Sequence, residues 1–342
     1  MKGGGVQRIE SHAGDIDRLL LASFLSCGEE FLSGEDLSAA ALVSRTSVWK
    51  RIEALRDHGF IFESVPSRGY RLVNLPDFLH PAAIAAGMIT ERVGGTLVTH
   101  REIGSTNTAM ARLAEAGAEE GTVLLAESQS QGKGRLGRVW ASPGGVNLYC
   151  SVLLRPPISP FDAPQLTLLS AVAVARTITA CSTLVPVIKW PNDILVNGRK
   201  VAGLLNEMTA ETDRVATVVL GFGVNLNMAS EQFPPELRYP ASSLFLEGGG
   251  RINRIAFTRR LLEELDTLYG RYLGGGYGAI REEWISLCGV INRRVRVDDG
   301  GAPTREGVVV GIEESGALLL RRDDGGVESI YTGDVSLCGQ TG

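Results

Sequence analysis

The sequence has no long apolar run, few cysteines and no excess of positive charge, and each absence excludes a class of protein. Its longest apolar stretch runs from Leu168 to Ala175 and ends at Arg176, far short of the roughly 18 residues that cross a bilayer. Five cysteines without a Cys-x-x-Cys pair indicate neither a disulfide framework nor a thiolate zinc site. A formal net charge of −5 excludes attachment to nucleic acid by overall charge alone. We therefore expect a cytoplasmic protein without a membrane partner, in which any DNA contact needs a local basic patch.

Length and glycine are what the sequence has in abundance. With 342 residues, the chain is long enough for two or three domains of about 150 residues each. Its 42 glycines exceed the share of about 7% that is average for proteins. The excess predicts glycine-rich turns and ligand-facing loops.

Residues 15–74 predict a winged helix-turn-helix, preceded by a loose polar tail of residues 1–14. Apolar residues recur at helical spacing in two segments, and a third helix is predicted between the N-cap residue Ser44 and Gly59. The apolar face of this third helix comprises Val48, Ile52 and Leu55. Residues 60–73 then form two strand-like runs around a Pro-Ser-Arg-Gly turn. Three short helices followed by a hairpin are the order of this DNA-binding fold.

The rest of the chain predicts a central mixed α/β domain over residues 82–285 and a small SH3-like β-barrel over residues 289–338, after a linker of residues 74–80. In the central domain, β-rich and helical segments alternate: strands at 122–128, 147–154 and 214–226, helices at 105–116, 166–180 and 254–273. After Trp284 the pattern changes to short strands separated by Gly and Asp. The whole chain is therefore expected to be a multidomain α+β protein.

A basic, glycine-rich segment is the most informative part of the central domain. Residues 128–140 carry three positive charges and no acid, and Gly132, Gly134 and Gly137 alternate with the cations. Glycines let backbone N–H groups approach an anion that the cations neutralise, so the segment predicts a phosphate-binding loop. It is neither a Walker A loop nor a Rossmann motif, because no Gly-Lys-Ser/Thr opens a helix and no helix obviously follows. Taken alone, a flexible surface loop without a ligand is an equal alternative.

Two further segments place polar side chains at the ends of elements. Lys189 follows an apolar run and precedes Trp-Pro-Asn-Asp, where a partly desolvated cation acts more strongly than in water. Ser105, Thr106 and Asn107 are consecutive at a predicted helix start, beside free N–H groups. Taken singly, the first is also typical of an ordinary turn lysine, and the second of simple N-capping.

Together these segments resemble the biotin protein ligases. The run Gly132-Lys133-Gly134-Arg135-Leu136-Gly137 matches the G-R-G-R-x-G loop of that family, and residues 189–193 match its K-W-P-N-D motif. Residues 105–107 match its S-T-N motif, in the same order along the chain. With the predicted winged helix-turn-helix and barrel, the resemblance extends over nearly the whole chain to family members that are both ligase and biotin operon repressor. Lys133 stands where arginine is common in the family. Lysine keeps the positive charge but lacks the guanidinium group that binds a phosphate through two hydrogen bonds.

The resemblance implies which residues bind the substrates. For biotin they are Ser105, Thr106, Asn107, Gln129, Lys133, Gly134, Arg135 and Lys189. For ATP and the adenylate they are Gly132, Lys133, Arg135, Arg138, Trp140, Asn192 and Asn225. Lys189 and Arg135 are expected to be catalytic, because they and Mg²⁺ would share the charge of a biotin carboxylate meeting the α-phosphate of ATP. Biotinoyl-5′-AMP would then pass biotin to a lysine of a biotin carboxyl carrier domain of a carboxylase.

The N-terminal domain is expected to bind operator DNA. Residues 44–73 hold six cations against three acids, a local positive excess in an acidic protein. The expected DNA contacts lie early in the third helix and in the wing: Arg45, Thr46, Ser47, Trp49, Lys50 and Arg68. So small a patch makes few contacts with DNA phosphates, and tight binding to DNA therefore needs two copies of the chain. The resemblance implies a homodimer that the ligand promotes.

Other functions stay open at this point. One is a biotin-sensing repressor with little catalysis, and another is a lipoate or octanoate ligase, against which the glycine loop and K-W-P-N-D favour biotin. A winged helix that serves only packing or regulation is a further alternative for the N-terminal domain.

Overall fold

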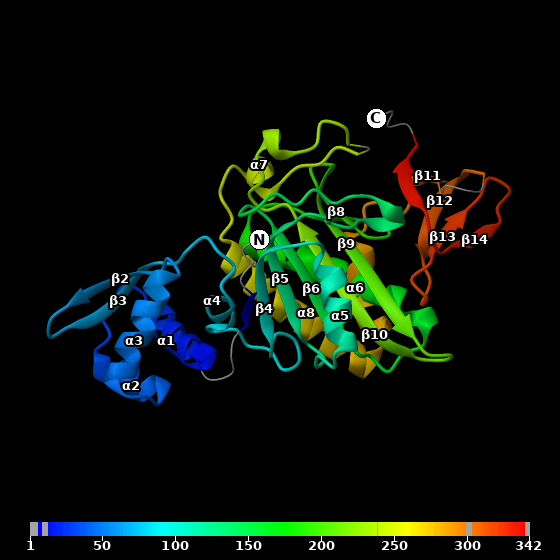
Figure 1. The fold of residues 1–342 in the computed structure, drawn as a ribbon. Helices are drawn as coiled ribbons and strands as arrows, with labels where there is room; N and C mark the ends of the chain where they lie inside the picture. Colours follow the sequence, from blue (N-terminus) through cyan, green and yellow to red (C-terminus); the bar gives the residue numbers. More distant parts are fainter. Residues whose placement is uncertain (1–5, 9–12, 238, 299–302, 339–342) are drawn as a thin grey trace.

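The computed structural model describes residues 6–8, 13–237, 239–298 and 303–338 (Figure 1). Along the chain it shows a small helical domain with a hairpin, a large sheet with helices on its faces, and a C-terminal antiparallel β domain. The predicted multidomain α+β fold is confirmed.

The N-terminal domain has three helices and a hairpin: α1 (Ala13–Cys27), α2 (Gly34–Ala41), α3 (Arg45–Asp57), β2 (Ile61–Val65) and β3 (Gly69–Asn74). Ser44 caps α3 by accepting from the Ser47 N–H, and Val48, Ile52 and Leu55 are buried, as predicted. The wing turn requires Gly69, whose φ is +99° and whose added Cβ would lie 2.0 Å from the carbonyl oxygen of Leu32.

The central domain is built on a mixed sheet of eight strands in the order β1-β4-β5-β6-β10-β9-β8-β7, in which only the β4–β5 pair is parallel among the described strands. The strands are β1 (Val6–Arg8), β4 (Leu97–Ile103), β5 (Val123–Gln129), β6 (Leu148–Leu154), β7 (Val187–Lys189), β8 (Asp193–Val196), β9 (Arg199–Ala210) and β10 (Val215–Val224). The predicted strands β5, β6 and β10 are confirmed within two residues of their expected ends.

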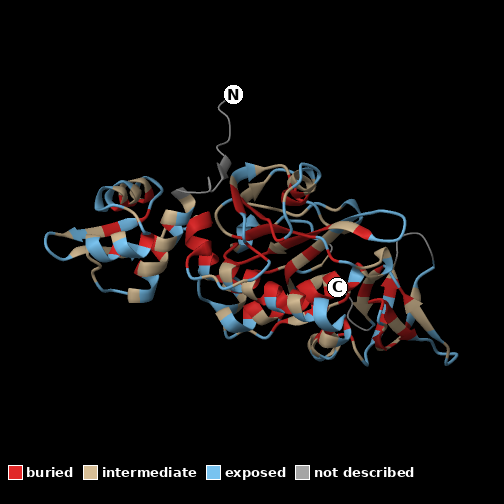
Figure 2. Cartoon of the chain, turned by 90° about the horizontal axis from the view of Figure 1, so that it is seen from below, coloured by how far each residue is buried: buried red, intermediate tan, exposed pale blue. Residues whose placement is uncertain are grey.

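Helices cover both faces of this sheet because its side chains alternate between two apolar layers. Val123 and Leu125 belong to the main core, whereas Leu124 between them packs in a smaller cluster with Met110 of α5 (Thr106–Glu115). The main core lies under three long helices: α6 (Pro164–Cys181), α8 (Arg254–Gly275) and α9 (Gly278–Leu287). Two short helices, α4 (Pro81–Ala85) and α7 (Leu244–Gly248), complete the domain. Figure 2 shows the buried residues concentrated between the sheet and these helices.

The expectation of a loose tail over residues 1–14 is wrong in part. Residues 6–8 form β1, which pairs antiparallel with β4 so that Val6 faces His100, and α1 already begins at Ala13. An edge strand is held by backbone groups, so its composition gave no signal. The other residues of the predicted tail, 1–5 and 9–12, lie outside the described residues.

The C-terminal domain is a five-stranded antiparallel sheet in the order β14-β13-β12-β11-β15. Its strands are β11 (Arg294–Asp298), β12 (Arg305–Ile312), β13 (Leu318–Arg321), β14 (Val327–Ile330) and β15 (Asp334–Leu337). The indole Nε1 of Trp190 donates to the carbonyl oxygen of Gly316 at 3.1 Å, so the K-W-P-N-D segment contacts this domain directly.

The segment predicted as a linker is held firmly by one buried arginine. Arg254, 1% exposed, donates to the Asp77 carboxylate at 2.9 Å and the Glu127 carboxylate at 2.8 Å. It also donates to the carbonyl oxygens of Asp77 and Asn147. The second oxygen of Glu127 accepts from the Leu79 N–H at 2.8 Å. Residues 77–79 are therefore part of the central domain's hydrogen-bonded frame.

We predict that Arg254→Met lowers the free energy of unfolding by about 3–5 kcal/mol, because it leaves the Glu127 carboxylate buried without its cation. Arg251→Met is the matched control, since the exposed Arg251 pairs with the same Asp77 at 3.0 Å and should cost less than about 1 kcal/mol. Urea unfolding followed by circular dichroism measures both. Equal losses in the two variants would contradict the central role of Arg254.

Candidate functional site

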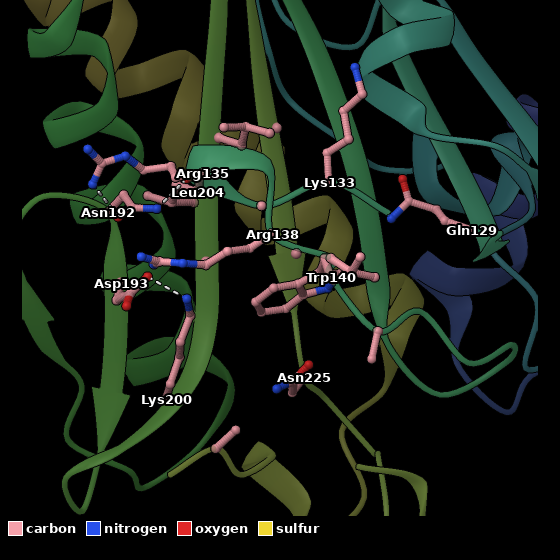
Figure 3. A pocket seen from close by; sticks show the side chains of 18 of the residues that line it. Gln129, Lys133, Arg135, Arg138, Trp140, Asn192, Asp193, Lys200, Leu204 and Asn225 are labelled. Carbon is pink, nitrogen blue, oxygen red and sulfur yellow. Dashed lines mark hydrogen bonds and ion pairs between the residues drawn. The ribbon is translucent and has the colours of Figure 1, made fainter. Parts of the chain in front are cut away.

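A pocket lies between the start of α5, the glycine-rich loop and strands β9 and β10 (Figure 3). It is lined by most of the residues that the sequence singles out: Ser105, Thr106, Asn107, Gln129, Lys133, Gly134, Arg135, Arg138, Trp140, Asn192 and Asn225. Of the predicted site residues in the central domain, Gly132 and Lys189 are not among the residues that line it. The fold thus gathers three segments that are far apart in sequence.

The start of α5 is capped by a distant glutamine. The carboxamide oxygen of Gln129 accepts from the Thr106 N–H at 2.8 Å and from its hydroxyl at 3.2 Å. The Gln129 amide nitrogen donates to Ser142 at 3.0 Å. Ser105 is buried and makes no side-chain capping bond to the described helix. Side-chain N-capping is therefore wrong for Ser105, which lines the pocket.

The side chain of Asn107 is fully engaged by protein groups. Its amide nitrogen donates to the carbonyl oxygen of Leu205 at 2.9 Å and to the carboxylate of Glu207 at 2.8 Å, and its oxygen accepts from Ser151 at 2.6 Å. A Cβ on Gly221 would lie 2.3 Å from the Asn107 oxygen. The amide is therefore held in one orientation.

The glycine-rich loop is folded back on itself and lines the pocket. Gly134 N–H donates to the Arg138 carbonyl at 2.7 Å, and Trp140 N–H donates to the Gly132 carbonyl at 2.9 Å. Between them lies a single 3₁₀ turn, η1 (Arg135–Gly137). No α-helix follows directly, as the sequence analysis expected.

The two arginines of this loop meet the C-terminal domain. Arg135 donates to Asn192 at 3.2 Å and to Thr332 at 3.3 Å, and desolvation lowers the pKa of its guanidinium. Arg138 forms a two-pronged ion pair with Asp334, whose hydrogen bond raises the pKa of Arg138. The loop thus spans the boundary between the central and C-terminal domains.

Sequence reasoning missed Lys200 and the small residues beneath Trp140. Lys200 of β9 lines the pocket, its amine 2.6 Å from the Asp193 carboxylate (Figure 3) and 5.3 Å from the centre of the Trp140 ring. An added Cβ would lie 2.9 Å from that ring at Gly203 and 2.6 Å at Gly223. The only available signal was the glycines of Gly221-Phe222-Gly223 and Ala202-Gly203, which alternate with apolar residues inside strands.

Lys189 occupies a different position from Lys200. Its ammonium lies over the ring of Tyr239, 3.9 Å from the ring centre, and it is Tyr239 that lines the pocket. The catalytic role expected of Lys189 stays a prediction.

In the N-terminal domain the expected DNA contacts are mostly exposed. Arg45, Thr46, Trp49, Lys50 and Arg68 are exposed and Ser47 is half-buried. Arg45 pairs with Glu35, and Arg68 stacks on Phe31 at 4.4 Å. The other cations counted in the basic patch, Arg51, Arg56 and Arg71, pair with Asp17, Glu53 and Glu63.

Two features are absent from the described residues. No helix among them is long and apolar enough to cross a membrane. No group of three or more His, Cys, Asp or Glu side chains in the described ranges is arranged to hold a metal ion.

Comparison with protein families matches three parts of the chain. Residues 18–71 match an HTH domain, residues 98–225 the biotin/lipoate A/B protein ligase family, and residues 290–338 the biotin protein ligase C-terminal domain. These ranges fall within the three predicted domains.

Individual relatives extend over almost the whole chain. The chain is 41% identical over 320 residues to the bifunctional ligase/repressor BirA of Bacillus spizizenii, covering 93% of this chain and 97% of the relative. It is 32% identical to the BirA of Escherichia coli, with 93% and 96% covered. Among solved structures, a biotin protein ligase from Aquifex aeolicus in complex with biotin and ATP is similar with a TM-score of 0.61 at 27% identity, covering 70% of this chain and 97% of that chain.

We predict that Gly223→Ala displaces the Trp140 ring, because the new methyl group would lie within 3 Å of three ring atoms. Tryptophan fluorescence should shift relative to wild type, and a Trp140→Phe background should abolish the shift. Gly250→Ala is the control, since nothing lies within 4 Å of its Cβ position. An unchanged Gly223→Ala spectrum would show that the ring does not rest on this glycine.

Proposed function

Because the chain belongs to the biotin protein ligases that carry an N-terminal DNA-binding domain, we propose that it adenylates biotin with ATP, transfers the biotin to a lysine of a biotin carboxyl carrier domain, and represses the biotin operon. Relatives over part of the chain include a biotin–[acetyl-CoA-carboxylase] ligase, which matches 64% of it. One observation carries the proposal: the pocket brings the Ser-Thr-Asn helix start, Gln129 and the glycine-rich loop together with Lys200. These relatives favour biotin over lipoate or octanoate as the substrate.

We propose that the ureido ring of biotin binds at the start of α5. There Ser105 lines the pocket without a side-chain capping bond, and Gln129 holds the Thr106 N–H and hydroxyl in place beside it. Arg135 and Lys200 then face the place where the biotin carboxylate meets the α-phosphate. Their charges offset the repulsion between two anions as the carboxylate oxygen attacks phosphorus and pyrophosphate leaves.

The second step needs no nucleophile from this chain. Biotinoyl-5′-AMP is a mixed anhydride, so the neutral amine of an acceptor lysine attacks its carbonyl and AMP leaves. The protein's part is to retain the adenylate and keep water from it, which we assign to the glycine-rich loop that covers the pocket with Arg135.

We propose that Mg²⁺ enters with ATP. The pocket carboxylates Asp193 and Asp334 are already paired with Lys200 and Arg138, and the described residues offer no ready-made ligand set. Magnesium commonly binds through substrate phosphates and few protein carboxylates. Its part would be to neutralise the pyrophosphate that leaves.

For repression we propose a homodimer formed at the edge of the central sheet. β9 pairs with β8 only as far as Gly203, so residues 204–210 carry no strand on that side among the described residues. Such an edge is able to pair with a second copy, and the glycine-rich loop contacts it through Lys133 and Glu207, 3.7 Å apart.

The cytoplasmic location expected from the sequence stays a prediction.

We predict that Lys200→Met lowers the rate of adenylate formation about 100-fold, since losing a transition-state cation costs on the order of 3 kcal/mol. Lys189→Met should lose less, because the Lys189 ammonium lies over Tyr239. Biotin-dependent exchange of labelled pyrophosphate into ATP measures both variants. The reverse order would establish Lys189 as the catalytic lysine that the resemblance implied.

We predict that biotin with ATP, but not ATP alone, strengthens binding to DNA upstream of biotin-synthesis genes, because only the adenylate promotes the dimer. Arg45→Ala with Lys50→Ala should abolish this binding and leave ligase activity intact. Gel-shift titrations and biotinylation of a carrier domain test both points. Binding that is independent of ligand, or retained by the double variant, would leave a ligase whose N-terminal domain has another role.

A further inference from the structure

One carboxylate on strand β9 touches two parts of the pocket. The Oε2 atom of Glu207 accepts from the amide of Asn107 at 2.8 Å, and its Oε1 atom lies 3.7 Å from the ammonium of Lys133. Asn107 belongs to the start of α5, and Lys133 to the start of the glycine-rich loop. Glu207 therefore contacts both the start of α5 and the glycine-rich loop.

The position of Glu207 on β9 links its contacts with Asn107 and Lys133 to the open edge of the sheet. Glu207 lies opposite Val219 of β10, in the stretch of β9 that β8 does not cover. The same stretch supplies the Leu205 carbonyl that accepts from Asn107 at 2.9 Å. A change in the path of this edge would therefore move both acceptors of the Asn107 amide and the anchor of Lys133 together.

The orientation of the Lys133 side chain agrees with a role in holding the base of the glycine-rich loop. In Figure 3 its ammonium points away from Arg138 and Trp140, while its main chain forms part of the loop. Lys133 and Val139 pair as an isolated antiparallel bridge, so the loop is fixed at its base by both backbone and side chain. The other Lys and Arg side chains that line the pocket are Arg135, Arg138 and Lys200.

We propose that Glu207 is a positioning residue that holds the glycine-rich loop and the Asn107 amide to the open edge of β9, and thereby couples retention of the adenylate to subunit association at that edge. The inference rests on the proposed function. The two contacts differ in strength: Asn107 is buried and its hydrogen bond to a carboxylate is strong, whereas the Lys133 pair is nearly half exposed on both sides and modest.

Two substitutions separate the contacts. Glu207→Gln keeps an acceptor for Asn107 but removes the charge that attracts Lys133, and Glu207→Ala removes both. Lys133→Gln removes the pair from the other side, and the double variant Lys133→Gln with Glu207→Gln closes a mutant cycle. Glu211→Gln is the matched control, because Glu211 follows β9 directly and pairs with exposed Arg214 at 2.7 Å.

The readouts are the dissociation rate of biotinoyl-5′-AMP, the KM for biotin, and the dimer dissociation constant with and without biotin and ATP. Lys133→Gln and Glu207→Gln should each speed adenylate release by about two- to five-fold, with no further increase in the double variant. Both should also reduce the ligand-induced gain in dimerisation. Glu207→Ala should in addition raise the KM for biotin by about ten-fold, more than Glu207→Gln does.

The outcomes separate this inference from the proposed function. A wild-type protein that makes no adenylate would overturn both. Normal adenylation with additive effects of Lys133→Gln and Glu207→Gln, or with both variants matching Glu211→Gln, would overturn the role of Glu207 alone. So would faster release with an unchanged ligand effect on dimerisation. Thermal melting identifies a variant that fails to fold, and the isosteric Glu207→Gln then carries the test.

Discussion

The buried guanidinium of Arg254 is the interaction on which the rest of the molecule depends. Its hydrogen bonds join the chain that leads out of the DNA-binding domain to β5 and to the start of β6. Two residues beyond Glu127, the same strand β5 ends in Gln129, which caps α5 at the pocket. The cation is costly to bury and is compensated only when both carboxylates and both carbonyls are in place. The orientation of the site and the exit of the N-terminal domain thus share one support.

Within the pocket, charges are paired before a substrate arrives. Lys200 pairs with Asp193 and Arg138 with Asp334, while Arg135 donates to neutral oxygens. Cations in a partly buried site need such partners to avoid the cost of desolvation. A phosphate bound in the proposed site would therefore compete with Asp193 for Lys200 and with Asp334 for Arg138. Gly203 and Gly223 leave room for the Trp140 ring against the sheet, and Gly221 leaves room for the Asn107 amide.

The parts that sequence predicted well are those governed by neighbours in the chain. The third helix, its buried face and its cap follow from spacing and capping residues, and so do α5, α6, α8 and most of the C-terminal strands. The family resemblance that three motifs carry singled out eleven residues that line the pocket. What sequence missed depends on distant contacts. β1 is defined by pairing with β4, the rigidity of residues 77–79 by Arg254, and the choice of Lys200 over Lys189 at the pocket by the path of β9.

The same dependence on distant contacts changes the electrostatics of the DNA-binding domain. Arg51, Arg56 and Arg71 raise the local charge when counted along the sequence, but each pairs with an acid inside the domain. Arg56 also donates to the carbonyl of Phe62, which holds the wing against α3. Arg56 and Arg71 therefore shape the wing and Arg51 joins α3 to α1. The proposed phosphate contacts would then fall mainly to the exposed Lys50 and Arg68, and to Arg45 once it leaves Glu35. Affinity for DNA rises with each phosphate that is neutralised. One copy with only these few cations therefore binds DNA weakly. Two copies double the contacts, so the dimer proposed at the β9 edge would also control DNA binding.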